Sequence, residues 1–378
     1  MSNSQNALEP EVEIACDACG EVAAEQVTSP AELASQVALA RRFHSERLTR
    51  HSRSAFEERA SFTHDYATRL LACRSCNLVY RSPRPAADSV LRAYQGERYA
   101  SERLPQMIAS QCALFRPKAR ALARMLGIGA RVLEVGSFVG GFLREARESG
   151  LEAVGIDPNE QMADLGRRAG LHVVPETLEL FAARRDLPPF DAVAIWNTFD
   201  QLPRPRAALE AALRVLRPAG LLLLRFPHGA CFRWLSAAKP CAVRTLAWNN
   251  LLGFPYLHGY GLRSLDALAS EFWMIRESVA GDTLGPVADE SYVYWARLEE
   301  RVVKAAQRRK WARDLSLAPW LDVRLRVDLS RNKGERKTSL SKGRHSAHEH
   351  EIDTVSSRSA HPPLPDRDLL GSGTRLLA

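Results

Sequence analysis

The sequence predicts an α/β fold, in which a mostly parallel sheet carries helices on both faces. Between about residue 105 and residue 230, short apolar runs alternate with amphipathic helical patterns, as is typical of βαβ units. A glycine-rich stretch, "EVGSFVGGF" at 134–142, directly follows the first of these runs. The second run ends in Asp157, 21 positions after Gly136. That distance is close to the roughly 20 residues at which a carboxylate holds the ribose of a bound nucleotide.

Runs of β-branched and aliphatic residues predict the strands. Five lie in the alternating region, at 131–136, 152–157, 172–174, 190–196 and 220–226. Two later runs, "EFWMIRESV" at 271–279 and "SYVYWARL" at 291–298, are predicted as the sixth and seventh strands. Helices are predicted from "GGFLREARESG", "NEQMADLGRRAG" and "PRAALEAALRVLRPAG". The last of these helices stops at Pro218, because proline cannot continue a helix.

Composition and charge set broad limits on the class of protein. The 378 residues are 46% hydrophobic and 25% charged, which is ordinary for a globular protein. The N-terminus has no basic stretch followed by an apolar one, and "GLLLLRF" is too short to cross a bilayer. We therefore expect a cytoplasmic protein without a membrane span. The net charge of +8 leaves nucleic acid open as a partner, although abundant arginine near the C-terminus explains it more simply.

The glycine-rich stretch distinguishes between two nucleotide cofactors. Phe138 stands where a dinucleotide-binding turn has its second glycine, and its side chain would obstruct the approach of a pyrophosphate. S-adenosylmethionine contains no phosphate. Glu134, beside the turn, would repel a pyrophosphate but suits the cationic end of a methionyl group. The sequence therefore favours S-adenosylmethionine over a nicotinamide cofactor, and a nicotinamide-dependent oxidoreductase is the weaker alternative.

Four stretches, taken in order, resemble the motifs of class I S-adenosylmethionine-dependent methyltransferases. They are "VLEVGSFVGGFL", "VGIDPN", "FDAVAIWNTFDQLPRP" and "ALRVLRPAGLLLLRFP". The resemblance covers about residues 115–298 and implies a Rossmann-like sheet of seven strands with the last strand antiparallel. It also implies cofactor contacts at Glu134, Gly136, Phe138, Gly140, Asp157, Thr177, Leu178 and Asn197. Many members carry a histidine where this chain has Asp200-Gln201-Leu202, so a general base at that place is in doubt.

Two Cys-x-x-Cys pairs precede this region. Cys16 with Cys19 and Cys73 with Cys76 could supply four thiolates to one structural zinc ion. Two alternatives are a mixed site with a histidine such as His64, and four cysteines that bind no metal. The sequence that follows the second pair resembles the N-terminal zinc-binding module of a methyltransferase subgroup that includes sugar C-methyltransferases. On that resemblance, Tyr94 and Tyr99 would help to cover the active site.

The acceptor is expected beyond the carboxyl ends of the strands, where open α/β sheets bind ligands. His228 follows the fifth strand, and Tyr256 and His258 lie in an aromatic stretch farther on. These three are the candidate catalytic residues, since imidazole titrates near neutral pH. A structural role is the alternative for both histidines, and methyl transfer needs no base where alignment supplies the rate.

The predicted domains are a zinc-binding module with a helical insertion at 1–104 and a methyltransferase domain at 105–300. A basic helix at 301–324 and a disordered tail at 325–378 follow. The expected function is methyl transfer from S-adenosylmethionine to a small-molecule acceptor, such as a sugar or a related metabolite. The alternatives are a methyltransferase acting on RNA or protein, and a zinc-bearing protein that binds without catalysis.

Overall fold

The computed structural model describes residues 14–50, 66–185, 187–237, 242–285, 290–311 and 314–328. His64 and the predicted tail from residue 329 onward lie outside this part of the chain. Among the described residues, no helix has the length and apolar character needed to cross a membrane.

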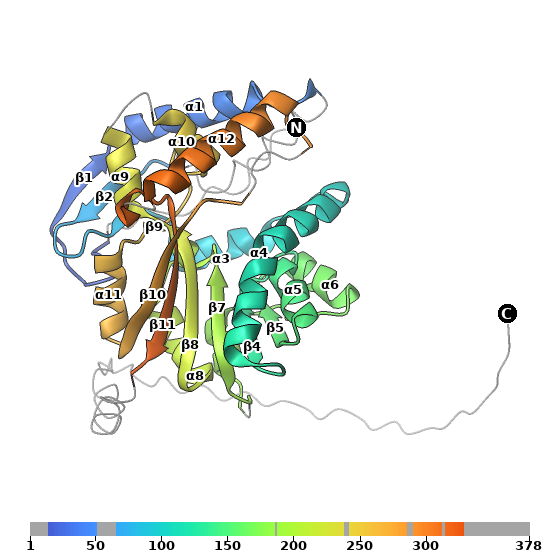
Figure 1. The fold of residues 1–378 in the computed structure, drawn as a ribbon. Coiled ribbons are helices and arrows are strands. Elements are labelled where there is room, and N and C mark those ends of the chain that lie inside the picture. The colour runs from blue at the N-terminus through green and yellow to red at the C-terminus, as the bar shows by residue number, and fades with distance from the viewer. Residues whose placement is uncertain are drawn as a thin grey trace, which may run out of the picture. The chain divides into compact units, whose positions relative to one another are not determined.

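Within the described residues the main sheet has seven strands, and it confirms the predicted fold class (Figure 1). In spatial order they are β10 (Met274–Asp282), β11 (Trp320–Val327), β8 (Leu216–Pro227), β7 (Phe190–Trp196), β4 (Arg131–Val135), β5 (Glu152–Ile156) and β6 (His172–Val174). From β8 to β6 each strand pairs in parallel with its neighbour. Strand β11 runs antiparallel to both β8 and β10. The sheet therefore matches the seven-stranded arrangement with an antiparallel last strand.

Helices cover both faces of this sheet (Figure 1). On one face lie α4 (Leu104–Leu126), α5 (Gly141–Glu148) and α6 (Glu160–Arg168). On the other lie α7 (Leu178–Ala182), α8 (Pro205–Val215) and α11 (Leu262–Ser270). Successive residues of a strand enter different clusters, as Val132 and Leu133 do. Because both faces are buried, strands such as 190–196 read as nearly continuous apolar runs.

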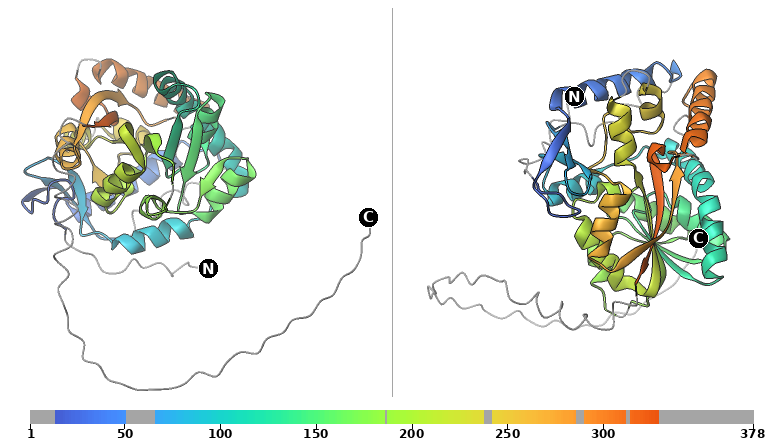
Figure 2. Two further views of the ribbon diagram at one scale, coloured as in Figure 1. Left: turned by 90° about the horizontal axis from the view of Figure 1, so that it is seen from below. Right: turned by 60° about the vertical axis from the view of Figure 1, so that its left-hand side comes forward.

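A third apolar cluster lies over the carboxyl ends of the parallel strands. It joins α1 (Pro30–Ser45), α9 (Gly229–Ala237), α10 (Val243–Trp248) and α12 (Tyr294–Trp311). Helix α10 contacts both α1 and α12, and Figure 2 shows the three at one end of the sheet. Trp248 is fully buried there, with the ring of Phe43 edge-on at 5.1 Å.

The N-terminal part forms a second, four-stranded antiparallel sheet. Its order is β1 (Ala24–Thr28), β2 (Arg69–Cys73), β3 (Val79–Ser82) and β9 (His258–Gly259). Helix α3 (Ala87–Gly96) leads from it toward α4. Single 3₁₀ turns are η2 (Ser101–Arg103), η3 (Phe199–Gln201) and η4 (Leu315–Leu317). Because β9 comes from residues far along the chain, the N-terminal sheet is not built from residues 1–104 alone.

The predicted seventh strand at 291–298 is wrong, because α12 begins at Tyr294. The last strand is β11, so the boundaries drawn at residues 300 and 324 do not match the sheet. Its sequence, "WLDVRLRV", alternates apolar and charged residues, which is the pattern of a strand. The predicted boundaries divided this strand, with residues 320–324 in the basic helix and residues 325–327 in the tail. The run at 291–298 is rich in aromatic residues, but it packs with helical spacing.

Helix α12 keeps polar side chains on its inner face. Ala296, Glu300, Lys304 and Gln307 are all buried at helical spacing. Lys304 pairs with Glu300 and donates to the carbonyl oxygens of Leu284 and Gly285 at 2.9 and 3.0 Å. Each buried charge therefore has partners, as burial requires.

We expect Leu325→Ala to lower the free energy of unfolding by about 2–5 kcal/mol, because truncating a buried leucine leaves a cavity. Leu325 is fully buried in β11, and urea unfolding followed by circular dichroism measures the change. Arg324→Ala is the matched control on the other face of the strand, where Arg324 Nε lies 2.8 Å from Glu277 Oε2. That half-exposed ion pair should contribute about 1 kcal/mol or less. Equal, small effects of both changes would contradict a sheet strand at 320–327.

Candidate functional site

The turn after β4 is built from backbone conformations that favour glycine. Gly136 has φ 72° and Gly140, the N-cap of α5, has φ 74°. The N–H groups of Gly136 and Ser137 both donate to the Ile156 carbonyl oxygen, at 2.8 and 3.0 Å. A Cβ on Gly136 would lie 2.9 Å from Thr198 Cγ2, so a side chain there would displace the segment after β7. The turn is thereby tied to the ends of both β5 and β7.

Phe138 takes a left-handed conformation with φ 47°, which is strained for a bulky residue. Two contacts hold it. Its N–H donates to Asp157 Oδ2 at 2.8 Å, and its ring meets the ring of Tyr99 edge-on at 5.0 Å. The other oxygen of Asp157 accepts from the N–H of Asn159 at 2.9 Å. Asp157 therefore joins the glycine turn to the segment that follows β5.

A cavity of about 340 Å³ lies at the carboxyl ends of β4, β5, β6 and β7. Four parts of its wall follow these strands, and the fifth comes from α3 and the residues after it. The strand side supplies Val135, Gly136, Phe138, Ile156, Asp157, Pro158, Asn159, Met162, Glu176, Thr177, Leu178, Glu179, Trp196, Asn197, Thr198, Gln201, Leu202, Pro203, Arg204 and Ala208. The helix side supplies Ala87, Val90, Leu91, Tyr94, Glu97, Tyr99 and Gln111. Ligands of open α/β sheets bind at this edge.

The structure brings together most of the residues predicted from the sequence as cofactor contacts. Those that line the cavity are Gly136, Phe138, Asp157, Thr177, Leu178 and Asn197. Glu134 and Gly140 are not part of the lining. Glu134 is 2% exposed, and its Oε2 has no hydrogen-bond partner among the described residues. Gly140 is the N-cap of α5, and a Cβ added there would lie 2.5 Å from Leu171 Cδ1.

Three carboxyl groups at this site have raised pKa values. Burial raises the pKa of Glu134 well above its usual range, and the nearby Asp157 adds to the effect. Burial also raises the pKa of Asp157, although the N–H groups of Asn159 and Phe138 oppose it. Burial raises the pKa of Glu97 on the other side of the cavity. A cation placed among these groups would favour their ionised forms.

The helix side of the cavity is fixed by polar contacts. The Tyr94 hydroxyl donates to Gln201 Oε1, and Gln201 Nε2 donates to the Asn197 carbonyl oxygen at 2.9 Å. Asn159 Nδ2 donates to the carbonyl oxygens of Tyr94 and Glu97, both at 2.9 Å. Tyr94 and Tyr99 thus lie on the cavity wall. Sequence reasoning missed Glu97 and the pairing of Gln201, whose only signal was its place after the fourth strand.

The three candidate catalytic residues do not line this cavity. His228 is buried, with Nδ1 3.0 Å from the Ala318 carbonyl oxygen. His258 is fully buried, and its Nε2 lies 2.8 Å from both Arg84 Nη1 and Asp17 Oδ2. Burial lowers the pKa of both histidines. The Tyr256 hydroxyl accepts from Asn250 Nδ2 at 3.1 Å. Their catalytic role stays a prediction.

A fourth carboxyl group near the site is that of Asp200. Burial raises its pKa to about 8, while Arg225 opposes the shift. Its side chain is fully buried, and neither oxygen has a hydrogen-bond partner among the described residues. Asp200 does not line the cavity, but its neighbour Gln201 does.

The four cysteines of the two pairs meet in one cluster. Their Sγ atoms all lie within 4.8 Å of one another. Those of Cys16 and Cys76 are 3.4 Å apart, and those of Cys19 and Cys73 are 3.5 Å apart. Sulfur atoms of a tetrahedral zinc site with Zn–S bonds of about 2.3 Å are about 3.8 Å apart. The donor set and its spacing therefore fit a zinc ion.

The cysteine cluster is linked to the cavity wall through a residue of the first pair. Asp17 lies between Cys16 and Cys19, and its Oδ1 accepts from Arg84 Nη2 at 2.9 Å. The same nitrogen donates to the Pro203 carbonyl oxygen at 3.1 Å. Pro203 lines the cavity, so the N-terminal sheet supports the segment after β7.

Comparison with known proteins agrees with this geometry. Residues 106–273 match the family model of a methyltransferase domain. Uncharacterized methyltransferases of Mycobacterium bovis and Mycobacterium tuberculosis are 34% identical over 96 residues, which is 24% of this chain and 37% of theirs. The chain thus spans little more than a third of the length of these curated relatives.

Solved structures of similar fold include two S-adenosylmethionine-dependent methyltransferases. The one from Archaeoglobus fulgidus is 15% identical, with a TM-score of 0.39 over 57% of this chain and 94% of its own. The one from Mesorhizobium loti is 19% identical, with a TM-score of 0.36 over 56% and 96%. Residues 106–273 of this chain thus match a methyltransferase domain, and the seven-stranded sheet with its antiparallel β11 is the arrangement that the resemblance in the sequence implied.

Proposed function

We propose that the chain binds S-adenosylmethionine in the cavity and transfers its methyl group to a small-molecule acceptor, such as a sugar or a related metabolite. The observation that carries the proposal is the wall formed by the glycine turn and the Asp157 carboxylate. Both lie at the carboxyl edge of the sheet, in a cavity of about 340 Å³, within the size range of small-molecule sites.

The ribose of the cofactor would bind at Asp157. Each carboxylate oxygen already accepts one backbone N–H, which leaves further lone pairs for ribose hydroxyls. The adenine would lie against the apolar surface of Ile156 and Leu178, beside Thr177. The methionyl end would cross the glycine turn at Gly136. Phe138 supports this choice because a pyrophosphate would need a small residue at its position.

The charge of the cofactor also fits the site. Glu97 and Asp157 face the cavity, and Glu134 lies buried beside it, each with a pKa raised by burial. S-adenosylmethionine carries a sulfonium and an ammonium group. These cations would stabilise the ionised carboxylates, whereas a pyrophosphate would be repelled.

The acceptor would lie between α3 and the segment after β7. Val90 and Leu91 give this part of the wall an apolar surface, and the Tyr94–Gln201 pair gives it polar groups. A small molecule with an apolar face and a few hydroxyl groups suits such a wall. Gln201 can donate and accept hydrogen bonds but cannot take a proton, so this side of the site would orient the acceptor.

The reaction would be an in-line displacement. Bound S-adenosylmethionine would supply an electrophilic methyl group. The acceptor's nucleophile would bond to this methyl group as its bond to sulfur breaks, and S-adenosylhomocysteine would leave. The residues of the chain contribute by holding the two reactants in line, which alone can supply a large part of the rate. Tyr94 and Tyr99 would exclude water from the same space.

We further propose that the cysteine cluster binds one zinc ion. Cys16, Cys73 and Cys76 are buried and Cys19 is half-buried, so four thiolates would close the coordination sphere. A closed site has no open position for a substrate, and its role would be structural. It would hold Asp17 in place for its contact with Arg84.

Calorimetric titration with S-adenosylhomocysteine tests the cofactor. We expect saturable binding of S-adenosylhomocysteine and none of NADH in a parallel titration, because the turn has no room for a pyrophosphate. Radioactive methyl transfer to fractionated small molecules, RNA and protein then identifies the acceptor class. Label in the RNA or protein fraction alone would overturn a small-molecule acceptor without affecting the proposed cofactor.

We expect Asp157→Ala to weaken binding of S-adenosylhomocysteine about 10- to 100-fold. The change removes hydrogen bonds to a charged group, which contribute about 1.5–3 kcal/mol each, and it releases the turn at Phe138. Calorimetry gives the affinity, and zinc content should not change. Asp164→Ala, on the surface of α6, is the control and should bind normally. Unchanged binding by Asp157→Ala would place the cofactor elsewhere.

We expect Cys76→Ser to lose the zinc, because a hydroxyl group is a poor ligand where thiolates are needed. Elemental analysis of the purified wild-type protein should give about one zinc per chain, and that of the variant close to none. The thermal midpoint should fall in parallel, since metal binding contributes to folding. Cys112→Ser, on α4 and outside the cluster, should keep its zinc. A zinc-free wild-type protein would contradict the proposal.

A further inference from the structure

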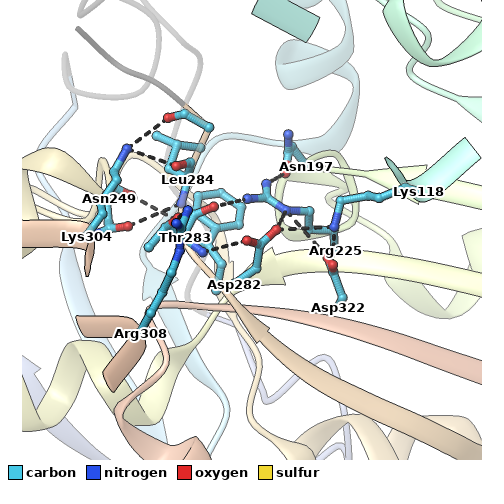
Figure 3. Close-up of polar contacts among 12 residues, drawn as sticks. Lys118, Asn197, Arg225, Asn249, Asp282, Thr283, Leu284, Lys304, Arg308 and Asp322 are labelled. Carbon is cyan, nitrogen blue, oxygen red and sulfur yellow. Dashed lines mark hydrogen bonds and ion pairs between the residues drawn. The ribbon is translucent and has the colours of Figure 1, made fainter. Parts of the chain in front are cut away.

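Arg225 is a fully buried arginine at the carboxyl edge of the sheet, near the end of β8. Its guanidinium group is surrounded by acceptors (Figure 3). Nε lies 3.1 Å from Asp282 Oδ2, and Nη2 donates to the Thr283 carbonyl oxygen at 2.6 Å. The group also lies over the ring of Trp320, with Cζ 4.6 Å from the ring centroid.

A further contact of the guanidinium group is to the cavity wall. Nη1 donates to the side-chain oxygen of Asn197, and Figure 3 shows the amide nitrogen turned away from Arg225. A guanidinium group has donors only. The amide oxygen of Asn197 must therefore face it, and the opposite orientation would set two donors against each other. Arg225 thus fixes which end of the amide is left for a ligand.

The backbone of Asn197 is held just as firmly. It has φ 54°, in the left-handed region, and its N–H donates to the Arg225 carbonyl oxygen at 3.0 Å. Its own carbonyl oxygen accepts from Gln201 Nε2 at 2.9 Å. Among the described residues no atom accepts a hydrogen bond from Asn197 Nδ2, although the residue lines the cavity. Its N–H₂ group is the polar group left for a ligand.

The strand order gives the position of Asn197 relative to the proposed cofactor. Strand β4 lies between β5 and β7, so Asp157 and Asn197 are on opposite sides of the glycine turn. Two strand spacings separate them, about 10 Å. A nucleoside with its ribose at Asp157 that extends across Gly136 would bring its amino-acid end to Asn197. The only hydrogen-bond acceptor at that end is the carboxylate, because the ammonium group has donors only.

We propose that Asn197 binds the methionyl carboxylate of the cofactor through its amide N–H₂ group, and that Arg225 is the positioning residue that sets this polarity. The inference rests on the proposed cofactor site and adds the recognition of one end of the cofactor. It also gives Arg225 a role beyond the ion pairs with Asp282 and Asp322.

Asn197→Asp tests the polarity directly. Aspartate tolerates the left-handed backbone, and its carboxylate can still accept from Arg225. We therefore expect the thermal midpoint to stay at or above that of the wild-type protein. Toward the ligand, however, the change removes two donors and adds a negative charge. Calorimetry should show S-adenosylhomocysteine binding at least tenfold weaker.

Methylthioadenosine provides the comparison, because it keeps the adenosine and the sulfur but has no amino-acid end. We expect Asn197→Asp to bind it within about twofold of the wild-type affinity. Asn250→Asp is the matched control, since Asn250 has the same φ of 54° and does not line the cavity. It should bind both ligands normally.

Arg225→Lys tests the positioning role. Lysine keeps a positive charge for Asp282. Its single ammonium group, unlike the planar guanidinium group, cannot also donate to Asn197. We expect S-adenosylhomocysteine to bind about three- to tenfold more weakly and methylthioadenosine to bind normally. A merely structural role would lower both affinities together, or only the thermal midpoint.

The outcomes separate this inference from the proposed function. Unchanged S-adenosylhomocysteine binding by Asn197→Asp would overturn the inference and leave the cofactor site standing. An equal loss of both ligands would also overturn it, because the effect would not depend on the amino-acid end. A wild-type protein that binds neither ligand would refute the proposed cofactor site, and with it the inference about Asn197 and Arg225.

Discussion

A buried guanidinium group needs an acceptor for each of its donor directions, and this requirement organises the carboxyl edge of the sheet. Arg225 on β8 meets it with Asp282 at the end of β10, Asp322 on β11 and Asn197 after β7. Lys118 on α4 completes the cluster by pairing with both aspartates. Arg225 thus links β8, β10, β11 and the segment after β7. Removing it would leave two carboxylates poorly compensated at the edge where the ligand is proposed to bind.

The glycine turn depends on the Asp157 carboxylate in a comparable way. Phe138 has a left-handed backbone conformation that would favour glycine. The hydrogen bond from its N–H to Asp157 stabilises this conformation. The same carboxylate is the proposed ribose ligand. Asp157 would therefore both hold the turn and bind the ribose, so zinc content accompanies the affinity measurement. Tyr99 reinforces the arrangement from the other side of the cavity.

The N-terminal sheet is more than an attached module. Its last strand, β9, comes from the segment after α10, and Asp17 of the first cysteine pair contacts both Arg84 and His258. His258 therefore takes part in joining the cysteine cluster to the cavity wall, which explains its complete burial. Any metal bound by the cysteines would stabilise this junction. The contacts of Asp17 with Arg84 and of Arg84 with Pro203 link the proposed zinc site to the cavity wall.

Local patterns in the sequence determined the alternation of strands and helices, the glycine turn, the carboxylate after β5 and the two cysteine pairs. Each of these depends on spacing within a few residues or on one repeated βαβ unit. The tertiary structure decided the rest. The aromatic run at 291–298 suggested a strand, yet α12 forms there because Ala296 and Glu300 pack inward with helical spacing. The pairing of His258 with Asp17 spans 241 positions, and the orientation of Asn197 depends on Arg225, 28 positions away. Such contacts form only when the chain has folded, because no local pattern encodes which distant side chain will satisfy a buried charge.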